Sequence, residues 1–322
     1  MFDPAWRILL GIVLLGVGGE ALLRGAVGLA TRFRLSPALI GLTVVAAGTS
    51  VPELAVSVIA SLRGQSDIAV ANAVGSNLFN MGGVLGLCAL VRPLAITGNT
   101  IRLEYPVLLI VTLMCVAVSQ DGVLNWVDGV LFLAVYVGFT AYMVTLVRGQ
   151  VSAAENAELK AEVSELSGAR APRLALLIAL IAVGVALLGL GAQQTVTGAI
   201  TLARLLGMSE RVIGLTIVAV GTSLPEVVAS LMSSIRGRDD IAIGNVIGSN
   251  LFNILGLLGL SSVIHPLRVH PSIASVDNWW MLGMTLLLFP LMYTGRIVRR
   301  GEGGLLVAVY VTYVAILLLR TA

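Results

Sequence analysis

Charged side chains are scarce in this 322-residue sequence. They make up 11% of it, whereas hydrophobic residues make up 57%. A water-soluble protein carries more charge at its surface and needs less apolar material in its core. The balance therefore excludes an ordinary soluble domain and indicates a protein whose solvent is the lipid bilayer. The net charge of +3 comes without a clustered basic face, so nothing in it suggests a nucleic-acid partner.

Cysteine and histidine are rare as well, with two of each. Cys88 and Cys115 fall in apolar segments, so they predict neither a disulfide framework nor a thiolate metal cluster. His265 and His270 lie in a Pro-bounded loop, and we interpret them as loop residues. Zinc and copper, which favour thiolate or imidazole ligands, are therefore poor candidates for a bound metal.

Apolar segments long enough to cross a membrane recur along the whole chain. A spanning helix needs about 20 mainly apolar residues, and glycine is scattered through these segments where a soluble helix would show a polar face. We interpret the first as a retained helix rather than a signal peptide, because it is too long and contains Glu20 and Arg24. The segments are 6–31, 37–62, 67–90, 102–119, 126–147, 174–203, 210–235, 241–264, 275–294 and 302–320.

The two halves of the chain repeat each other. The sequence GLTVVAAGTSVPE (41–53) is answered by GLTIVAVGTSLPE (214–226), and RGQSDIAVANAVGSNLFN (63–80) by RGRDDIAIGNVIGSNLFN (236–253). The offset is the same in both cases, since position 53 corresponds to 226 and position 80 to 253. No gap is needed between the two blocks, so the repeat indicates duplication rather than chance or shared apolarity.

A hydrophilic segment, residues 148–173, separates the repeats 1–147 and 174–322. We interpret it as a solvated connector, with a regulatory ion site as the alternative. Because each half has five expected spans, the second half enters the membrane upside down. The sequence therefore predicts an all-α integral membrane protein with ten transmembrane helices arranged as two inverted five-helix repeats.

The basic residues near the segment ends predict the orientation. Lys and Arg lie on one side of the expected spans in a roughly two-to-one excess, and such an excess marks the cytoplasmic side. This places the connector in the cytoplasm and both termini outside it. We expect a multi-pass protein of the cell (inner) membrane.

Each repeat carries one glutamate about midway along a span, Glu53 in the second and Glu226 in the seventh. An ionisable side chain at membrane depth costs about 2.5 to 3.5 kcal/mol on insertion scales. No Lys, Arg or His lies near either glutamate in its own segment, so we expect a bound cation to compensate the charge. A protonated glutamate bonded to a neighbouring helix is the structural alternative, but it leaves the duplicated motif unexplained.

A proline, Pro52 or Pro225, precedes each acid. Its missing N–H and its clash with the carbonyl four residues back should open the helix locally. Backbone carbonyls such as those of Ala46 and Ala219 would then face the interior, which is tolerated at membrane depth only around a cavity. Hydroxyl groups one turn before the acids share their helix face; they belong to Thr49, Ser50, Thr222 and Ser223.

The third and eighth spans add polar side chains at every fourth position. We interpret Asn72 and Asn245 as hydrogen-bonding contacts between helices. For Asn80 and Asn253, which close the matched motif in both copies, we favour a binding role. The full sets are Asn72, Ser76 and Asn80, and Asn245, Ser249 and Asn253.

All of these candidate ligands are oxygen atoms, which suit hard cations such as calcium and sodium. Magnesium fits a wide cage less well, because it requires a small octahedral site and keeps its waters. Two carboxylates neutralise one calcium ion or two sodium ions, whereas the empty site would carry two uncompensated charges across a low-dielectric barrier. The site therefore predicts obligatory exchange, which becomes electrogenic with a third sodium ion. We expect no resident cofactor.

With GTSVPE (48–53) and GSNLFN (75–80), answered by GTSLPE (221–226) and GSNLFN (248–253), the sequence closely resembles the cation/calcium exchanger superfamily. It is most similar to the small prokaryotic sodium/calcium exchangers. The resemblance implies a ten-helix antiporter whose first and sixth helices slide across a rigid core. The ligands that it implies are Glu53, Glu226, Thr49, Ser50, Thr222, Ser223, Ser76 and Ser249, with backbone oxygens near Ala46 and Ala219.

The sequence departs from its relatives and from its own symmetry at two places. The last residue of GSNLFN can be Asp in relatives but is Asn in both copies here, at Asn80 and Asn253. Potassium-dependent members carry an acid at the second of these sites, so the resemblance predicts transport without potassium. Glu20 and Arg24 correspond to Gln193 and Thr197 in the second repeat. We interpret them as an i, i+4 pair inside the first span, with a role in ion access as the alternative.

Three functions stay open at this point. The first is sodium/calcium antiport, and the second is calcium/proton antiport in which the same glutamates carry protons. The third is a membrane hydrolase using Ser50 or Ser223, which is weak because the apolar segments contain no His or Lys as a base. The expected partners are the two ions and the lipid bilayer; a monomer suffices for this site.

Overall fold

The computed structural model describes residues 4–33, 35–147, 173–207 and 219–321, and most of these residues are helical. The first half contains α1 (Pro4–Phe33), α2 (Pro37–Ile40), η1 (Gly41–Val45), α3 (Ala46–Thr49), α4 (Val51–Leu62), α5 (Ser66–Phe79), η2 (Asn80–Val84), α6 (Leu85–Val91), β1 (Leu94–Ala95), η3 (Thr100–Glu104), α7 (Tyr105–Val118), η4 (Ser119–Asp121), β2 (Val123–Leu124) and α8 (Trp126–Val147). The second half contains α10 (Leu174–Leu205), α12 (Ala219–Gly221), α13 (Leu224–Ile235), α14 (Asp239–Leu251), η6 (Phe252–Leu258), α15 (Gly259–Ile264), β3 (Leu267–Arg268), η7 (Ile273–Asp277), α16 (Asn278–Tyr293), β4 (Ile297–Val298) and α17 (Arg300–Thr321).

Among the described residues, seven helices are long and apolar enough to cross a membrane. The number rises to eight if Pro37–Thr49 and Val51–Leu62, which meet at 47°, form one broken span. The expected seventh span is described from residue 219 onward, and the expected ninth is the helical stretch 273–293, which is not among these seven or eight. The count of ten therefore stays a prediction. The predicted connector lies outside the described residues, apart from Arg173.

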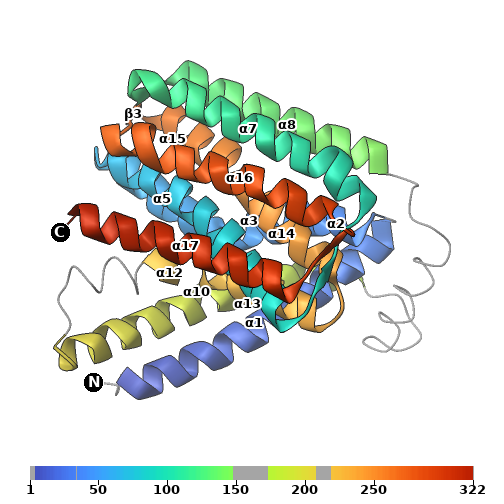
Figure 1. The fold of residues 1–322 in the computed structure, drawn as a ribbon. Helices are drawn as coiled ribbons and strands as arrows, with labels where there is room; N and C mark the ends of the chain where they lie inside the picture. The colour runs from blue at the N-terminus through green and yellow to red at the C-terminus, as the bar shows by residue number, and fades with distance from the viewer. Residues whose placement is uncertain (1–3, 34, 148–172, 208–218, 322) are drawn as a thin grey trace.

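Two helical stretches form the centre of the molecule, where Figure 1 shows α5 and α14 surrounded by the other helices. The apolar part of Asp239–Ile264 is 94% buried and that of Ser66–Val91 is 78% buried, whereas the corresponding parts of α8, α10 and α17 are only 17–22% buried. A helix that is apolar all round and still exposed is stable in lipid, where its backbone groups bond within the helix. The arrangement is that of a membrane protein with a polar-lined core.

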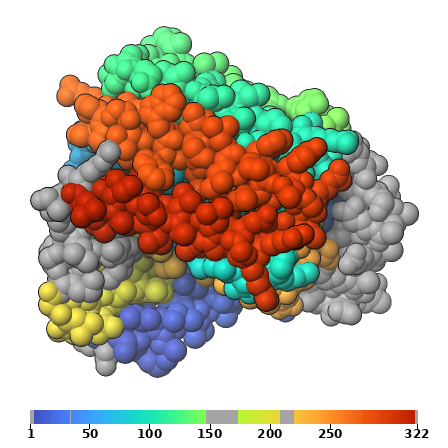
Figure 2. Space-filling view, in the orientation of Figure 1, coloured from blue at the N-terminus to red at the C-terminus, as the bar shows by residue number. Residues whose placement is uncertain are grey.

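The outer surface carries large apolar side chains. Figure 2 shows α16 and α17 lying across one face of the molecule. Leu305, Val311 and Leu319 on α17 are exposed, and so are Leu176 and Val183 on α10. Exposed leucine and valine at this density would be a liability in water, so these helices face lipid.

The helices α1 and α10 pack side by side at one edge of the molecule (Figure 1). A Cβ atom added to Gly18 would lie 2.8 Å from the backbone nitrogen of Leu188 and 2.9 Å from the carbonyl oxygen of Gly184. A Cβ atom on Gly184 would lie 2.6 Å from the nitrogen of Leu22. Glycine thus lets the two backbones approach closely, which is how membrane helices associate without a hydrophobic driving force between them.

An ion-pair cluster connects α1 to the core. The Arg24 Nε atom lies 2.7 Å from Glu20 Oε1, as the i, i+4 interpretation predicted. The other carboxylate oxygen of Glu20 lies 2.7 Å from a guanidinium nitrogen of Arg236, at the end of α13. The internal pair is therefore confirmed, and the contact with the second half of the chain is an addition that the sequence did not indicate.

Short antiparallel strand pairs join the two halves of the chain. Strand β1 pairs with β4, and β2 pairs with β3. The Asp239 side chain at the start of α14 also accepts a hydrogen bond from the Ala95 backbone nitrogen, at 3.0 Å. Each repeat is therefore tied to the other at several points outside the central helices.

The repeat of the sequence is also a repeat of local structure. Helices α4 and α13 are both 12 residues long and begin at equivalent positions of the two repeats, Val51 and Leu224. The π-helical turns η3 and η7 occupy equivalent positions as well. Irregular backbone is thus copied together with the motifs.

The two cysteines lie in helices and the two histidines lie in a loop, as the sequence predicted. Cys88 and Cys115 are buried free thiols. His265 and His270 are exposed between α15 and η7. The interpretation of the two histidines as loop residues is confirmed.

The close packing of α1 against α10 predicts a position-specific effect of one methyl group. We expect Gly18→Ala to lower the thermal midpoint of the detergent-solubilised protein by several degrees, because overpacking a tight contact costs about 1 to 3 kcal/mol. Gly16 on the same helix is the matched control, since a Cβ atom there meets nothing within 4 Å. Equal midpoints for Gly18→Ala and Gly16→Ala would contradict the close approach.

Candidate cation-binding site

Both glutamate motifs lie at breaks between helices. Helix α3 ends at Thr49 and α4 begins at Val51; between them Ser50 has φ −86° and ψ 8°. Ser223, between α12 and α13, has nearly the same conformation, with φ −92° and ψ 11°. The local opening that the prolines predicted is therefore present in both copies. It places each acid in the first turn of the following helix, where the helix dipole favours a negative charge.

The two breaks meet each other in space. The Ser50 hydroxyl donates to Glu226 Oε1 at 2.8 Å, and the Ser223 hydroxyl donates to Glu53 Oε1 at 3.1 Å. Each glutamate is thus bonded to the serine of the other repeat. The two carboxyl groups are fully buried, with 0% and 1% of Glu53 and Glu226 exposed.

The second oxygen of each carboxyl group stands without a protein partner. Within the described residues, Glu53 Oε2 and Glu226 Oε2 are buried and accept no hydrogen bond. Buried polar atoms are nearly always paired, because an unmade hydrogen bond costs about 1 to 3 kcal/mol. Each of these unpaired oxygens belongs to a glutamate that is bonded to the serine of the other repeat. A cation bound between the two glutamates could coordinate both oxygens.

The asparagines that close the repeated motif are buried beside this pair of breaks. Asn80 begins the π-helical turn η2, and both polar atoms of its amide lack a partner in the described part of the chain. Asn253 lies in η6; its Nδ2 atom donates to Asn77 Oδ1 at 3.1 Å, which leaves its own Oδ1 unpaired among the described residues. The wider π-helical turn alters the spacing of side chains along the helix, and it begins at or next to these residues in both copies.

The hydroxyl groups of the third and eighth spans differ from each other. Ser76 Oγ lies 3.5 Å from Ser223 Oγ and thereby reaches the Glu53 side of the site. Ser249 is 0% exposed and its hydroxyl has no partner in the residues that the structure describes. Ser76 therefore lies at the break around Ser223, whereas Ser249 is buried on α14. A role of either residue as a ligand stays a prediction.

Asn72 and Asn245 bond between helices, as their interpretation required. Asn72 Nδ2 donates to Ser57 Oγ at 2.9 Å, and Asn245 Nδ2 donates to Ser230 Oγ at 2.8 Å. Asn245 also accepts the hydroxyl of Thr49, at 3.2 Å. These amides therefore fix α4 against α5 and α13 against α14, with the candidate ligands between them.

The backbone carbonyl of Ala46 differs from its prediction. It accepts the Ser50 N–H at 3.1 Å and the Thr49 hydroxyl at 3.3 Å, so it stays within the helical hydrogen-bond pattern instead of being released. The reason is that the break at Ser50 comes directly after the last helical hydrogen bond of α3, which is the bond that the Ala46 carbonyl accepts. Ala219 is the first residue of α12, and a ligand role for its carbonyl stays a prediction.

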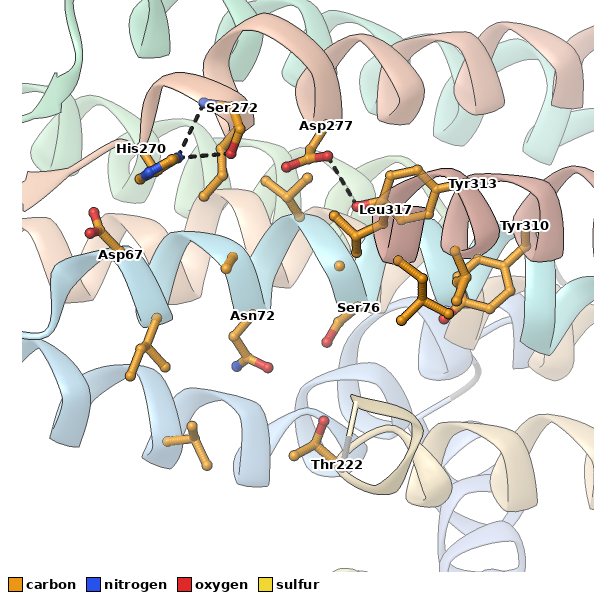
Figure 3. A pocket seen from close by; sticks show the side chains of 18 residues that line it. Asp67, Asn72, Ser76, Thr222, His270, Ser272, Asp277, Tyr310, Tyr313 and Leu317 are labelled. Atoms are coloured by element: carbon orange, nitrogen blue, oxygen red, sulfur yellow. Dashed lines mark hydrogen bonds between the residues drawn. The ribbon is translucent and has the colours of Figure 1, made fainter. Parts of the chain in front are cut away.

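A cavity of about 620 Å³ leads toward the site. Thr222 and Ser76 line it at the site end, and Figure 3 shows these two side chains pointing toward each other. Asn72 lines it further along α5. Two of its exposed lining residues, Asp67 and His270, lie at the end of the molecule where α5 begins and β3 ends.

Three polar residues of this region had escaped the sequence interpretation. Asn77 and Asn250 are the third letters of the two GSNLFN motifs, and Asn77 Nδ2 donates to the Asn250 carbonyl oxygen at 3.2 Å. Both amide atoms of Asn250 lack partners among the described residues. Their identity in both copies was an available signal. Asp277, which lines the cavity, lies outside the motifs.

The chemistry of the site is that of oxygen ligands. In the described residues no group of three or more His, Cys, Asp or Glu side chains could hold a metal ion. Two carboxylates, hydroxyls and amide oxygens remain, which is the ligand set of calcium and sodium rather than of transition metals. Because these candidate ligands come from both halves of the chain, a movement of one half against the other would change their arrangement.

Comparisons with known proteins agree with this architecture. The family model of the sodium/calcium exchanger protein matches residues 4–145 and 176–319. The chain is 36% identical to the inner membrane protein YrbG of Escherichia coli over 96% of this chain and 95% of that one. It is 31% identical to the sodium/calcium exchanger MaX1 of Methanosarcina acetivorans, over 96% and 97% of the two chains.

A solved structure shows the same fold. The sodium–calcium exchanger NCX_Mj superposes with a TM-score of 0.82 at 31% identity, covering 97% of this chain and 98% of that chain. The family model covers both repeats and all the residues of the two helix breaks that the structure describes. The chain therefore belongs to the sodium/calcium exchanger family of membrane transporters.

Proposed function

We propose that this protein is a secondary active antiporter that exchanges sodium for calcium by alternating access. One observation carries the proposal. Two buried glutamates from two copies of one motif meet at two helix breaks, each bonded to the other copy's serine and each with one oxygen unpaired in the described chain. A structural role would have satisfied these oxygens within the protein.

The ligands that we propose are the carboxylates of Glu53 and Glu226 with the surrounding hydroxyl, amide and carbonyl oxygens. The set comprises Thr49, Ser50, Ser76, Asn80, Thr222, Ser223, Ser249 and Asn253, and the backbone of Ala219. The two negative charges balance one calcium ion or two sodium ions. A third sodium ion in each cycle would make the exchange electrogenic.

The choice of ions also rests on the relatives. MaX1 is named a sodium/calcium exchanger, and the NCX_Mj structures were determined with sodium, calcium or strontium ions. Their matches cover 96% and 97% of this chain. The same ions are therefore the first to test as the cargo of the site.

Alternating access follows from the symmetry that we propose for the chain. Ten spans arranged as inverted five-helix repeats, 1–147 and 174–322, would let each half adopt the conformation of the other. The closely packed pair α1 and α10 can move as one body against the tied core. We place the protein in the cell membrane with both termini outside and the connector 148–173 in the cytoplasm; a monomer contains the whole site.

Calcium/proton exchange at the same glutamates is the second candidate function. It is favoured by the complete burial of both carboxyl groups, since burial disfavours the charged form of an acid. The two candidates differ in the gradient that drives calcium uptake, and one assay separates them.

The decisive assay is calcium flux in reconstituted vesicles. Vesicles loaded with sodium should take up calcium when external sodium is removed, and a pH gradient alone should not drive this uptake. Glu53→Gln and Glu226→Gln should each reduce it to the level of empty vesicles, because a neutral amide cannot balance the cation charge. Uptake driven by a pH gradient without sodium would establish the proton candidate instead.

Glu302→Gln is the matched control. It makes the same chemical change at the start of α17, where Glu302 Oε2 accepts the Arg299 backbone N–H, and glutamine can still accept that bond. We expect normal flux in this variant. Near-normal exchange in Glu53→Gln or Glu226→Gln would refute the proposed site.

Potassium dependence is tested at Asn253. We expect calcium uptake by the unmodified protein to be equal in potassium and in choline media, because an amide cannot balance an additional cation. Asn253→Asp adds a third carboxylate to the site, so its uptake should become dependent on potassium.

Asn125→Asp adds the same charge at the start of α8. There Asn125 Oδ1 accepts the Val127 backbone N–H at 2.8 Å, and aspartate keeps that cap. Its potassium response should match that of the unmodified protein. If the potassium dependence of calcium uptake is unchanged in Asn253→Asp, Asn253 does not explain transport without potassium.

A further inference from the structure

Asp277 is a buried carboxylate in the wall of the cavity that leads to the candidate site. It ends the π-helical turn η7 before α16, and it is 9% exposed. Its Oδ1 atom accepts the hydroxyl of Tyr313 on α17 at 3.3 Å, and Figure 3 shows these two side chains pointing toward each other at the cavity. Asp277 is not among the ligands of the proposed site, so its function is still to be explained.

The cavity joins Asp277 to both ends of a route. At one end lies Asp67, in the first turn of α5, which is exposed beside His270. At the other end lie Ser76 and Thr222, and Ser76 Oγ is 3.5 Å from the serine that holds Glu53. Asp277 lines the same cavity as Asp67, Ser76 and Thr222, so a cation inside this cavity would be attracted by its charge.

The presence of a carboxylate at this depth has a physical implication. Ionisable residues in membrane proteins are costly, and those that persist line substrate or ion pathways by default. A negative charge on the wall of a cavity also raises the local concentration of cations there. Asp277 meets both conditions, since it is nine-tenths buried and lines the cavity.

The repeat supplies a second carboxylate of the same kind. Glu104, at the end of η3, is the counterpart of Asp277 in the first repeat, and Asp240 is the counterpart of Asp67 in the second. Glu104 is 1% exposed, accepts the Thr100 hydroxyl at 3.0 Å and lies near enough to Asp240 for their charges to interact. Glu104 does not line the described cavity. Glu104 and Asp277 thus hold equivalent positions in the repeat but different environments.

We propose that Asp277 and Glu104 are entry carboxylates that attract cations to the site, each from a different side of the membrane. Asp277 lines the route that is open in this conformation. Glu104 is enclosed here and lines the opposite route when the two repeats exchange conformations. The inference rests on the proposed antiport and adds to it the residues through which each face recruits its ions.

The test measures calcium concentration dependence at each face separately. Membrane vesicles of the two orientations are loaded with sodium, and initial calcium uptake is measured against external calcium. Asp277→Asn should raise the half-saturating calcium concentration about fivefold at the face where the cavity opens, the size expected for one carboxylate about 8 Å from a calcium ion in water-like surroundings. Its maximal rate and the value at the other face should not change.

Glu104→Gln should raise the half-saturating calcium concentration in the same way, but at the other face of the membrane alone. Asp277→Glu keeps the charge and should restore the normal value. Tyr313→Phe removes the hydrogen bond but keeps the carboxylate, and its half-saturating concentration should also stay near normal. High ionic strength should reduce the shift of Asp277→Asn, since salt screens the attraction.

Several outcomes overturn the inference. An equal shift at both faces, or a lower maximal rate with an unchanged half-saturating concentration, would assign Asp277 to the structure of the protein alone. If Asp277→Asn does not accumulate in the membrane, Glu104→Gln decides by the same criterion. Normal exchange with no shift in either variant refutes the entry carboxylates and leaves the proposed function standing, whereas an unmodified protein without sodium-driven calcium uptake refutes both.

Discussion

The structure depends on keeping two carboxyl groups at membrane depth. Glu53 and Glu226 are buried completely, where an isolated charge has a high free energy. The helix breaks at Ser50 and Ser223 lower this free energy in two ways. They place each acid at the start of a helix, and they supply a hydroxyl group to the acid of the other repeat. Neither copy of the motif satisfies its own acid, so the two halves of the chain need each other for the stability of the centre.

Asparagine side chains around the breaks also form hydrogen bonds between helices. Asn72 and Asn245 hold neighbouring helices together within each repeat, whereas Asn77 connects Asn253 to the carbonyl oxygen of Asn250. The result is a polar layer inside helices that are otherwise apolar. It explains why the two central stretches are the most buried of the described spans, because their polar groups would be unsatisfied in lipid.

The sequence allowed the prediction of features that depend on a local motif or on the internal repeat. Pro52 and Pro225 predicted both helix breaks, and the constant offset between the repeats paired Glu53 with Glu226. It missed the contact of Glu20 with Arg236, the bonds of Asn77 and the position of Asp277 in the cavity. These depend on how distant helices pack, which no periodicity records. The Ala46 carbonyl shows a different limit, because a small uncertainty in where a helix breaks decides whether an oxygen is released.

The strand pairs β1–β4 and β2–β3 tie the loops of one repeat to the other, while α1 and α10 hold mainly to each other along their glycine contact. In the proposed exchange, α1 and α10 would be the pair that moves against this core. Each turnover would then drag the pair through the surrounding lipid. Bilayer thickness and viscosity would therefore set the speed of this protein as directly as the affinity of its ions.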